Sequence, residues 1–258
     1  MPDQEVGMGE PGVIVGWQLA VALVALVALA ALTSALGGLR TSTASVVAAV
    51  RAVVQLAVVA TLILAVVRAW WATGLFVLVM FAVATWTSGR RITPARSGLH
   101  AGLAILTGAV PVIAIILATG AVPLVGIAVV PIAGIVIGGA MTATSLAGRR
   151  ALDELHHRRG EYEAALSLGL LPRDATLLLI RPSARDALVP ALDQTRTVGL
   201  VTLPGAFVGV LLGGGEPLQA GSAQVLVLVG LLAAETLAVL VTVELIARGR
   251  IRRGDDHG

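Results

Sequence analysis

Long apolar runs constrain this chain more than any other feature of its sequence. A membrane-spanning helix needs about 20 mainly apolar residues, with a working range of roughly 17 to 25. The stretches that meet this requirement are about 13–36, 45–67, 70–87, 99–119, 122–140 with a continuation to 146, 187–212 and 223–247. The turns between them are short and carry Gly, Pro or Arg. We therefore predict an all-α, polytopic membrane protein with about seven transmembrane helices in a single membrane domain, residues 1–258.

Composition agrees with a chain embedded in lipid. Charged side chains make up 13% of the residues, whereas soluble proteins carry roughly 25%. The first 12 residues contain acidic but no basic side chains, unlike the positively charged start of a signal peptide, so we expect the first apolar run to remain as a span. The chain contains no cysteine, which excludes disulfides, thiolate metal ligands and a thiol nucleophile.

The basic side chains are all arginine, because the chain contains no lysine. A P-loop requires a lysine that reaches the β- and γ-phosphates of the nucleotide. If the protein is driven by ATP, the ATPase is therefore a different polypeptide. The arginines lie beside the apolar runs rather than on one basic face, so nucleic acid is not an expected partner.

The positions of the arginines predict the orientation, because short cytoplasmic loops are enriched in basic residues. With the N-terminus outside, Arg40, 90–96, 148–190 and 248–253 all fall inside. Only Arg68 then lies outside. We predict N-terminus out and C-terminus in, for a multi-pass protein of the cell's inner (cytoplasmic) membrane.

Ionisable and polar side chains within the spans are costly and are functional candidates. The translocation-pathway candidates are Arg51, Gln55, Asp193, Arg196 and Glu235. The first two lie one helical turn apart and share a face, while Glu235 is near the middle of the last span. Structural roles are the alternative for each: local ion pairs, arginine reaching the membrane surface, or a protonated carboxyl. Glu244 is placed to pair with Arg248 at i+4.

Metal ligands remain unassigned, because the histidines are scattered and no span supplies the several carboxylates that calcium or magnesium would need. Enzyme motifs such as GxSxG and HExxH are also missing. A membrane enzyme is therefore the least supported class. An ATP-independent secondary transporter or channel, with Glu235 as an ion or proton site, remains an alternative to an ATP-driven permease.

The longest polar segment, 148–190, is predicted to be a cytoplasmic loop that carries its own short helix. Residues 161–168 place acidic side chains in their first turn, where the helix dipole favours them. We expect breaks in the loop at Gly160, Gly169, Pro172 and Pro182. A helix set in a polar loop between spans is suited to docking a partner outside the membrane.

The sequence Glu163-Ala164-Ala165 followed by Gly169 resembles the EAA loop of ABC-transporter permeases. In that family the short helix sits in a groove of the ATPase subunit and transmits its closure to the spans. Arg181 departs from the pattern, which has leucine there. The resemblance implies that the coupling residues are Glu161, Glu163, Ala164, Ala165, Gly169 and Pro172.

The run Pro190–Gly205 resembles the signature of the FetB-like permeases, an iron-export ABC family, and the likeness covers almost the whole chain. It implies a homodimeric permease, not an enzyme, that works with a separate cytoplasmic ATPase binding ATP and Mg, and that itself holds no cofactor. The cargo it implies is an iron-like metal ion or a small solute. The residues with implied gating or packing roles are Gly199, Pro204, Gly205 and Gly209.

Three departures from that family bear on the cargo. Ala206–Val210 replaces an expected Met-Met-Thr-Gly-Gln, Gly139 stands where asparagine is usual, and Glu235 is not a residue of the family. We expect the fold and the coupling to the ATPase to survive these changes, while the cargo and the direction of transport stay open.

Overall fold

The computed structural model describes residues 16–66 and 68–254. Helices account for nearly all of this part of the chain, and six of them are long and apolar enough to cross a membrane. The prediction of an all-α, polytopic membrane protein is thereby confirmed. The described residues form two compact units, an N-terminal unit that contains the first two helices and a main unit that contains almost all the rest. The prediction of one membrane domain stays a prediction.

The N-terminal unit is a hairpin of α1 (Trp17–Leu36) and α2 (Ser42–Val66). Its turn is held by side chains, because the Thr41 amide donates to Ser34 Oγ at 3.1 Å and Ser42 Oγ donates to the Ala31 carbonyl at 2.9 Å. Ser34 is buried, whereas most other side chains of the hairpin are exposed. Such apolar, outward-facing helices are suited to contact with lipid or with other spans.

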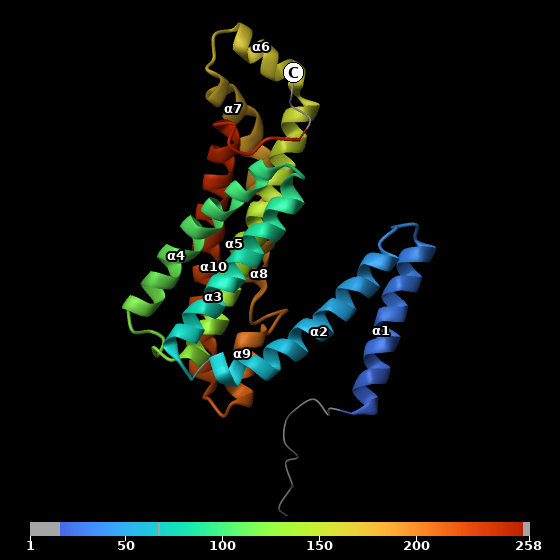
Figure 1. Cartoon of the computed structure of the whole chain (residues 1–258), viewed down its shortest axis with the longest axis vertical. Coiled ribbons are helices and arrows are strands. Elements are labelled where there is room, and N and C mark those ends of the chain that lie inside the picture. The colour runs from blue at the N-terminus through green and yellow to red at the C-terminus, as the bar shows by residue number, and fades with distance from the viewer. Residues whose placement is uncertain (1–15, 67, 255–258) are drawn as a thin grey trace, which may run out of the picture. The chain divides into compact units, whose positions relative to one another are not determined.

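The main unit is a bundle of α3 (Trp70–Ile92), α4 (Ala101–Ala118), α5 (Gly126–His157) and α10 (Pro217–Ala247), in which α5 and α10 pack along each other (Figure 1). Small residues let these helices approach closely. A Cβ added at Gly108 of α4 would overlap the Ala234 carbonyl of α10. The packing therefore depends on glycine at this contact.

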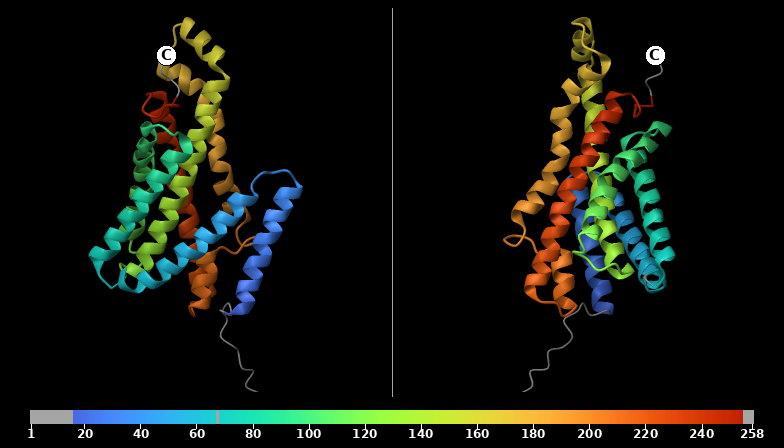
Figure 2. Two further views of the ribbon diagram at one scale, coloured as in Figure 1. Left: turned by 45° about the vertical axis from the view of Figure 1, so that its right-hand side comes forward. Right: turned by 90° about the vertical axis from the view of Figure 1, so that its left-hand side faces the viewer.

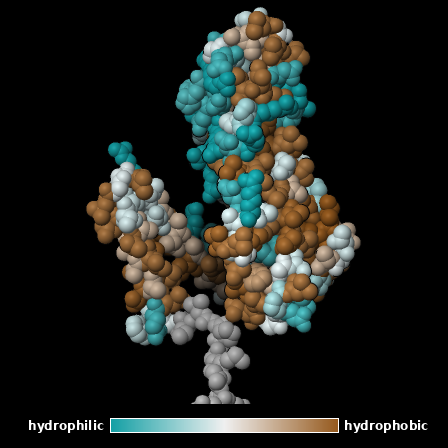
Figure 3. All heavy atoms as spheres, turned by 180° about the vertical axis from the view of Figure 1, so that it is seen from behind, coloured by the Kyte–Doolittle hydropathy of each residue, from teal (hydrophilic) through white to brown (hydrophobic). Residues whose placement is uncertain are grey.

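A polar end of the main unit is formed by the last turns of α5, by α6 (Arg159–Ser167) and by α7 (Pro172–Arg185). Hydrophilic side chains gather at this end, while hydrophobic ones dominate much of the rest of the same face (Figure 3). Figure 2 shows α7 and the helical segment that follows it, residues 186–197, running beside α5 and α10. The predicted polar loop with a helix of its own is present.

Two of the predicted breaks in this loop are wrong. The chain bends at Arg158 (φ −104°, ψ 31°), so Gly160 lies inside α6. Pro182 lies inside α7 without ending it. A helical proline costs about 3 kcal/mol, and packing of α7 against α5 and α10 offsets that cost. The breaks at Gly169, with φ +90°, and at Pro172, the first residue of α7, are confirmed.

The predicted span 187–212 is divided, which is why six long helices are found where seven were expected. Its pieces are η2 (Asp186–Leu188), α8 (Val189–Thr197), a loop over 198–204 and α9 (Gly205–Leu212). Gly199 adopts φ +80° and donates its N–H to the Thr202 carbonyl at 2.9 Å. Val198, in an extended conformation, ends α8, and the left-handed Gly199 turns the chain directly after it. Pro204 restricts the residue before it to extended conformations.

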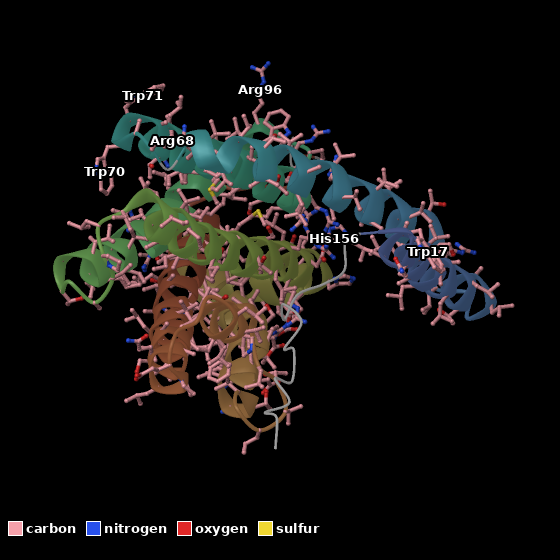
Figure 4. The ribbon with its side chains drawn as sticks, turned by 90° about the horizontal axis from the view of Figure 1, so that it is seen from below. Trp17, Arg68, Trp70, Trp71, Arg96 and His156 are labelled. Carbon is pink, nitrogen blue, oxygen red and sulfur yellow. The ribbon has the colours of Figure 1, made fainter. Side chains whose placement is uncertain are left out.

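The arginine-rich segments of the main unit meet at the polar end. Ser97, in η1 (Arg96–His100), bonds through Oγ to the backbone of Arg252 at 3.2 and 3.3 Å, and Arg253 pairs with Asp153 at 3.3 Å. Arg68 precedes the opposite end of α3, where Trp70 and Trp71 project away from the bundle (Figure 4). This segregation is what the predicted orientation requires, and the side of the membrane that each end faces stays a prediction.

Candidate functional site

The turn that leads into α6 is fixed by ion pairs. Arg158 donates from Nε to Glu161 Oε1 at 2.8 Å, bonds the other oxygen through NH2, and reaches Glu154 Oε1 at 3.2 Å. These bonds lower the pKa of the Glu161 carboxyl below its ordinary value and raise the pKa of Arg158 above its own. The next residue, Arg159, pairs with Glu163 at i+4, with 3.0 Å between Nε and Oε1. All these groups are near solvent, so the pairs orient the helix more than they stabilise it.

The two faces of α6 differ. Ala165 is buried and Tyr162 packs on the neighbouring buried cluster, so this face points inward. Ala164 is exposed, as are Leu168 (83%) and Leu171 (67%) just after the helix. Exposed leucines beside charged side chains, on a helix that protrudes from the polar end, form a surface of the kind that binds a partner protein.

Gly169 closes α6 through a left-handed cap. Its φ is +90°, its N–H donates to the Leu166 carbonyl at 2.9 Å, and the Leu170 N–H donates to the Ala165 carbonyl at 3.1 Å. A side chain is strained in this backbone region, whatever space surrounds it. Glycine at this position therefore sets the direction in which the chain leaves α6.

Ion pairs tie the polar end to the membrane helices. Arg173 of α7 holds both carboxylate oxygens of Glu244 on α10, each at 2.8 Å, and this contact raises the pKa of Arg173. Arg248 also donates to Glu244 at 2.5 Å, as the i+4 spacing predicts. Arg150 of α5 reaches Asp186, at the start of η2, at 3.5 Å. Planar two-point contacts of the Arg173 kind are among the stronger surface ion pairs.

A cavity of about 270 Å³ lies between α5, α8 and α10. Its polar lining residues are Thr142, Gln194 and Glu235, and the others are Gly or apolar, among them Leu146 and Leu231. Glu235 is partly buried and, within the described part of the chain, has no hydrogen-bond or salt-bridge partner. A Cβ at Gly139 would lie 2.8 Å from Glu235 Oε1. Glycine there leaves the space that the carboxylate occupies.

Of the five residues predicted for the translocation pathway, Glu235 lines the cavity and the other four do not. Asp193 and Arg196 are exposed and form an ion pair with each other, with 3.7 Å between Asp193 Oδ1 and Arg196 NH1. Neither lines the cavity. Arg51 and Gln55 belong to the N-terminal unit, where both are exposed on α2. The roles predicted for these residues stay predictions.

Gln194 and Thr142 were not selected by sequence reasoning, although one signal points to the first. Ala187, Ala191 and Gln194 are spaced i, i+4 and i+7, which places them on one helix face. All three line the cavity. Asp193 and Arg196, the charged neighbours of Gln194, stand out in the sequence but lie on another face of α8.

Further predicted residues fall at or near the divided span. Gly199 forms the break after α8, Pro204 precedes α9, and Gly205 begins it. A Cβ at Gly209 would meet no atom within 4 Å. Their gating or packing roles stay predictions. Among the residues that the structure describes, no three His, Cys, Asp or Glu side chains form a group that could hold a metal ion.

Comparison with known proteins points to one family. The profile described as "Uncharacterised protein family (UPF0014)" matches residues 17–251. The rice "UPF0014 membrane protein STAR2" is 36% identical over 166 residues, which cover 64% of this chain and 58% of that protein. The Arabidopsis thaliana "Protein ALUMINUM SENSITIVE 3" is 34% identical over 64% of this chain and 61% of its own length.

A bacterial relative carries a functional name. The Escherichia coli K12 "Probable iron export permease protein FetB" is 33% identical over 174 residues, 66% of each chain. The matches thus span about three fifths of the plant relatives and just under two thirds of the bacterial one. No solved structure matches this chain.

Proposed function

Since the chain belongs to the UPF0014 family of membrane proteins, we propose that it is the membrane-spanning permease subunit of an ABC transporter that exports a metal ion or a small solute. The observation that carries the proposal is α6, a short helix with a glycine cap that protrudes from the polar end of the main unit. A relative named as a probable iron export permease supports it. Two copies of the permease would work with two copies of a separate ATPase in the inner membrane.

The ATPase is the partner that α6 would bind. The exposed side of this segment offers Ala164, Leu168 and Leu171, and Arg159 with Glu163 flanks them. Small and apolar side chains bordered by charges are suited to a groove on another protein. ATP and Mg²⁺ would bind to the partner, in keeping with a chain that contains no lysine for a P-loop.

Movement of the docked helix has a physical route to the membrane interior. The Arg173–Glu244 contact joins α7 to α10, and the Arg150–Asp186 contact joins α5 to the segment that leads into α8. The helices α10 and α8 carry Glu235 and Gln194 into the cavity. Closure of the ATPase dimer would bias the bundle between two arrangements, which is what coupling requires.

The docking role of α6 is tested by replacing Gly169 with valine. A β-branched residue in the left-handed region is strained by about 1–2 kcal/mol, so the end of α6 should turn and displace the leucines. We expect the Gly169→Val chain to insert normally but to retain roughly tenfold less ATPase, since about 1.4 kcal/mol is a factor of ten in affinity. Co-purification with the candidate ATPase subunit, to be sought beside this protein's gene, measures the effect.

The matched control is Gly160→Ala, because Gly160 lies in the same helix without a left-handed backbone and with open space around it. That variant should retain the ATPase. Unchanged co-purification of Gly169→Val would overturn the docking role. Gradient-driven flux through the chain alone, lost in Glu235→Gln, would instead favour the ATP-independent transporter or channel, a candidate supported by the unpartnered carboxylate.

A further inference from the structure

Glu235 lacks a hydrogen-bond or salt-bridge partner among the described residues, and its position along α10 makes this lack informative about its function. It precedes Glu244 by nine residues on α10, which places it about 13 Å along the helix from the ion pairs of the polar end. The hydrocarbon core of a bilayer is about 30 Å thick. Glu235 therefore lies near the middle of the membrane-spanning part of α10, where an ionised group without a counter-charge is costly.

The cavity presents oxygen atoms to whatever enters it. The hydroxyl hydrogen of Thr142 is used in a bond to the Gly138 carbonyl at 2.9 Å, so the lone pairs of Oγ1 remain available. Gln194 brings an amide from α8, and Glu235 brings a carboxylate from α10. No basic side chain lines the cavity, and Leu146 and Leu231 supply apolar wall.

The size and charge of the cavity restrict its occupant. A volume of about 270 Å³ is far larger than the roughly 30 Å³ that one water molecule occupies, so a bare ion would not fill it. Multivalent hard metals take several carboxylates, whereas the lining supplies one. One carboxylate balances one positive charge.

We propose that this cavity binds a small monovalent ammonium cation, with Glu235 as its counter-charge. The oxygens of Gln194 and Thr142 accept its N–H groups, and Leu146 and Leu231 contact its hydrocarbon part. The assignment of this cation as cargo rests on the proposed export function. Binding itself does not, because it is a property of the permease without its ATPase.

The probe for this site is n-butylammonium, with 1-butanol as an uncharged analogue of similar shape. Binding to the full chain in lipid nanodiscs is measured by equilibrium dialysis in mildly alkaline buffer. We expect n-butylammonium to bind and 1-butanol not to compete. Glu235→Gln should weaken binding at least tenfold, and Gln194→Leu roughly threefold. Glu216→Gln, on an exposed residue that precedes α10 outside the cavity, should bind like the unmodified chain.

Four results would overturn the proposal: competition by 1-butanol, full binding by Glu235→Gln, displacement of the probe by equimolar Mg²⁺, or no binding at all. If Glu235→Gln does not fold, Gln194→Leu decides the matter, because Gln194 is exposed on α8. Co-purification of the ATPase is measured separately. Loss of probe binding with intact ATPase association would refute the ammonium site and leave the proposed function standing.

Discussion

The contact between Arg158 and Glu161 gives the start of α6 a pH dependence of definite sign. The guanidinium lowers the pKa of Glu161 in the folded protein. The stabilisation is therefore fully present above the pKa that Glu161 has in the unfolded chain. It is lost as the pH falls through the lower pKa that Glu161 has in the folded protein. We expect the ¹³C-carboxyl NMR titration of Glu161 to have a lower midpoint in the unmodified chain than in Arg158→Met.

The control for this titration is Arg159→Met, since Arg159 pairs with Glu163 rather than with Glu161. It should leave the Glu161 midpoint in place. Equal midpoints in the unmodified chain and in Arg158→Met would show that the ion pair does not hold in solution. The effect on unfolding free energy should stay small in either case, because solvent screens exposed ion pairs.

Which residues could be found from the sequence depended on charge. Glu235 and Glu244 stand out because ionisable side chains are rare in apolar runs. Gln194 and Thr142 do not stand out, because an uncharged side chain becomes part of a site only through the face it occupies and the helix opposite. Gly139 is a similar case, since the space it leaves for Glu235 exists only once α5 and α10 are packed.

The ion pair between Arg173 of α7 and Glu244 of α10 should transmit movement of the docked helix to α10 rather than bind the ATPase. Arg173→Met removes the two-point contact with Glu244 and leaves the exposed face of α6 intact. We expect normal ATPase co-purification but at least a threefold loss of transport per ATP hydrolysed by the reconstituted complex. The free energy of unfolding should fall only slightly, because solvent screens an exposed ion pair.

Arg181→Met is the matched control, because Arg181 is an exposed arginine of the same helix that forms no salt bridge with the described residues. It should transport normally. If Arg173→Met keeps full transport per ATP, the bridge has no part in coupling. If it loses the ATPase, its role is docking instead.

The existence of the elements was more predictable than their ends. Apolar runs identify spans because the bilayer demands length and internal hydrogen bonding. They do not show that Gly199 and Pro204 divide the run 187–212, since the run itself is long enough. At Pro182 the sequence predicts a break where the helix in fact continues. The packing of α7 against two helices outweighs the local helix-breaking preference of proline.

For the whole molecule, orientation can be tested directly because the chain contains no cysteine. Arg68 and Arg96 flank the two ends of α3, so Arg68→Cys and Arg96→Cys report opposite sides. We expect a membrane-impermeant maleimide to label Arg68→Cys in intact cells and Arg96→Cys only after permeabilisation. The physical reason is the preference of arginine-rich loops for the cytoplasm.

Cysteine at an exposed position of the α6 segment, Leu168→Cys, is the control and should behave like Arg96→Cys. The reverse labelling pattern would contradict the predicted orientation and place the polar end outside, away from any cytoplasmic ATPase. Labelling of all three in intact cells would show leaky membranes or misfolded protein rather than an orientation.

The uninterrupted course of α5 has a mechanical consequence. From Gly139, at the cavity, to His157, beside α6, the helix contains no proline and no break, and it measures about 27 Å along its axis. A rod of this kind does not hinge internally. A force on the polar end of α5 is therefore expected to tilt the whole helix, so that Gly139 at the cavity and His157 beside α6 move together, as the two ends of one lever.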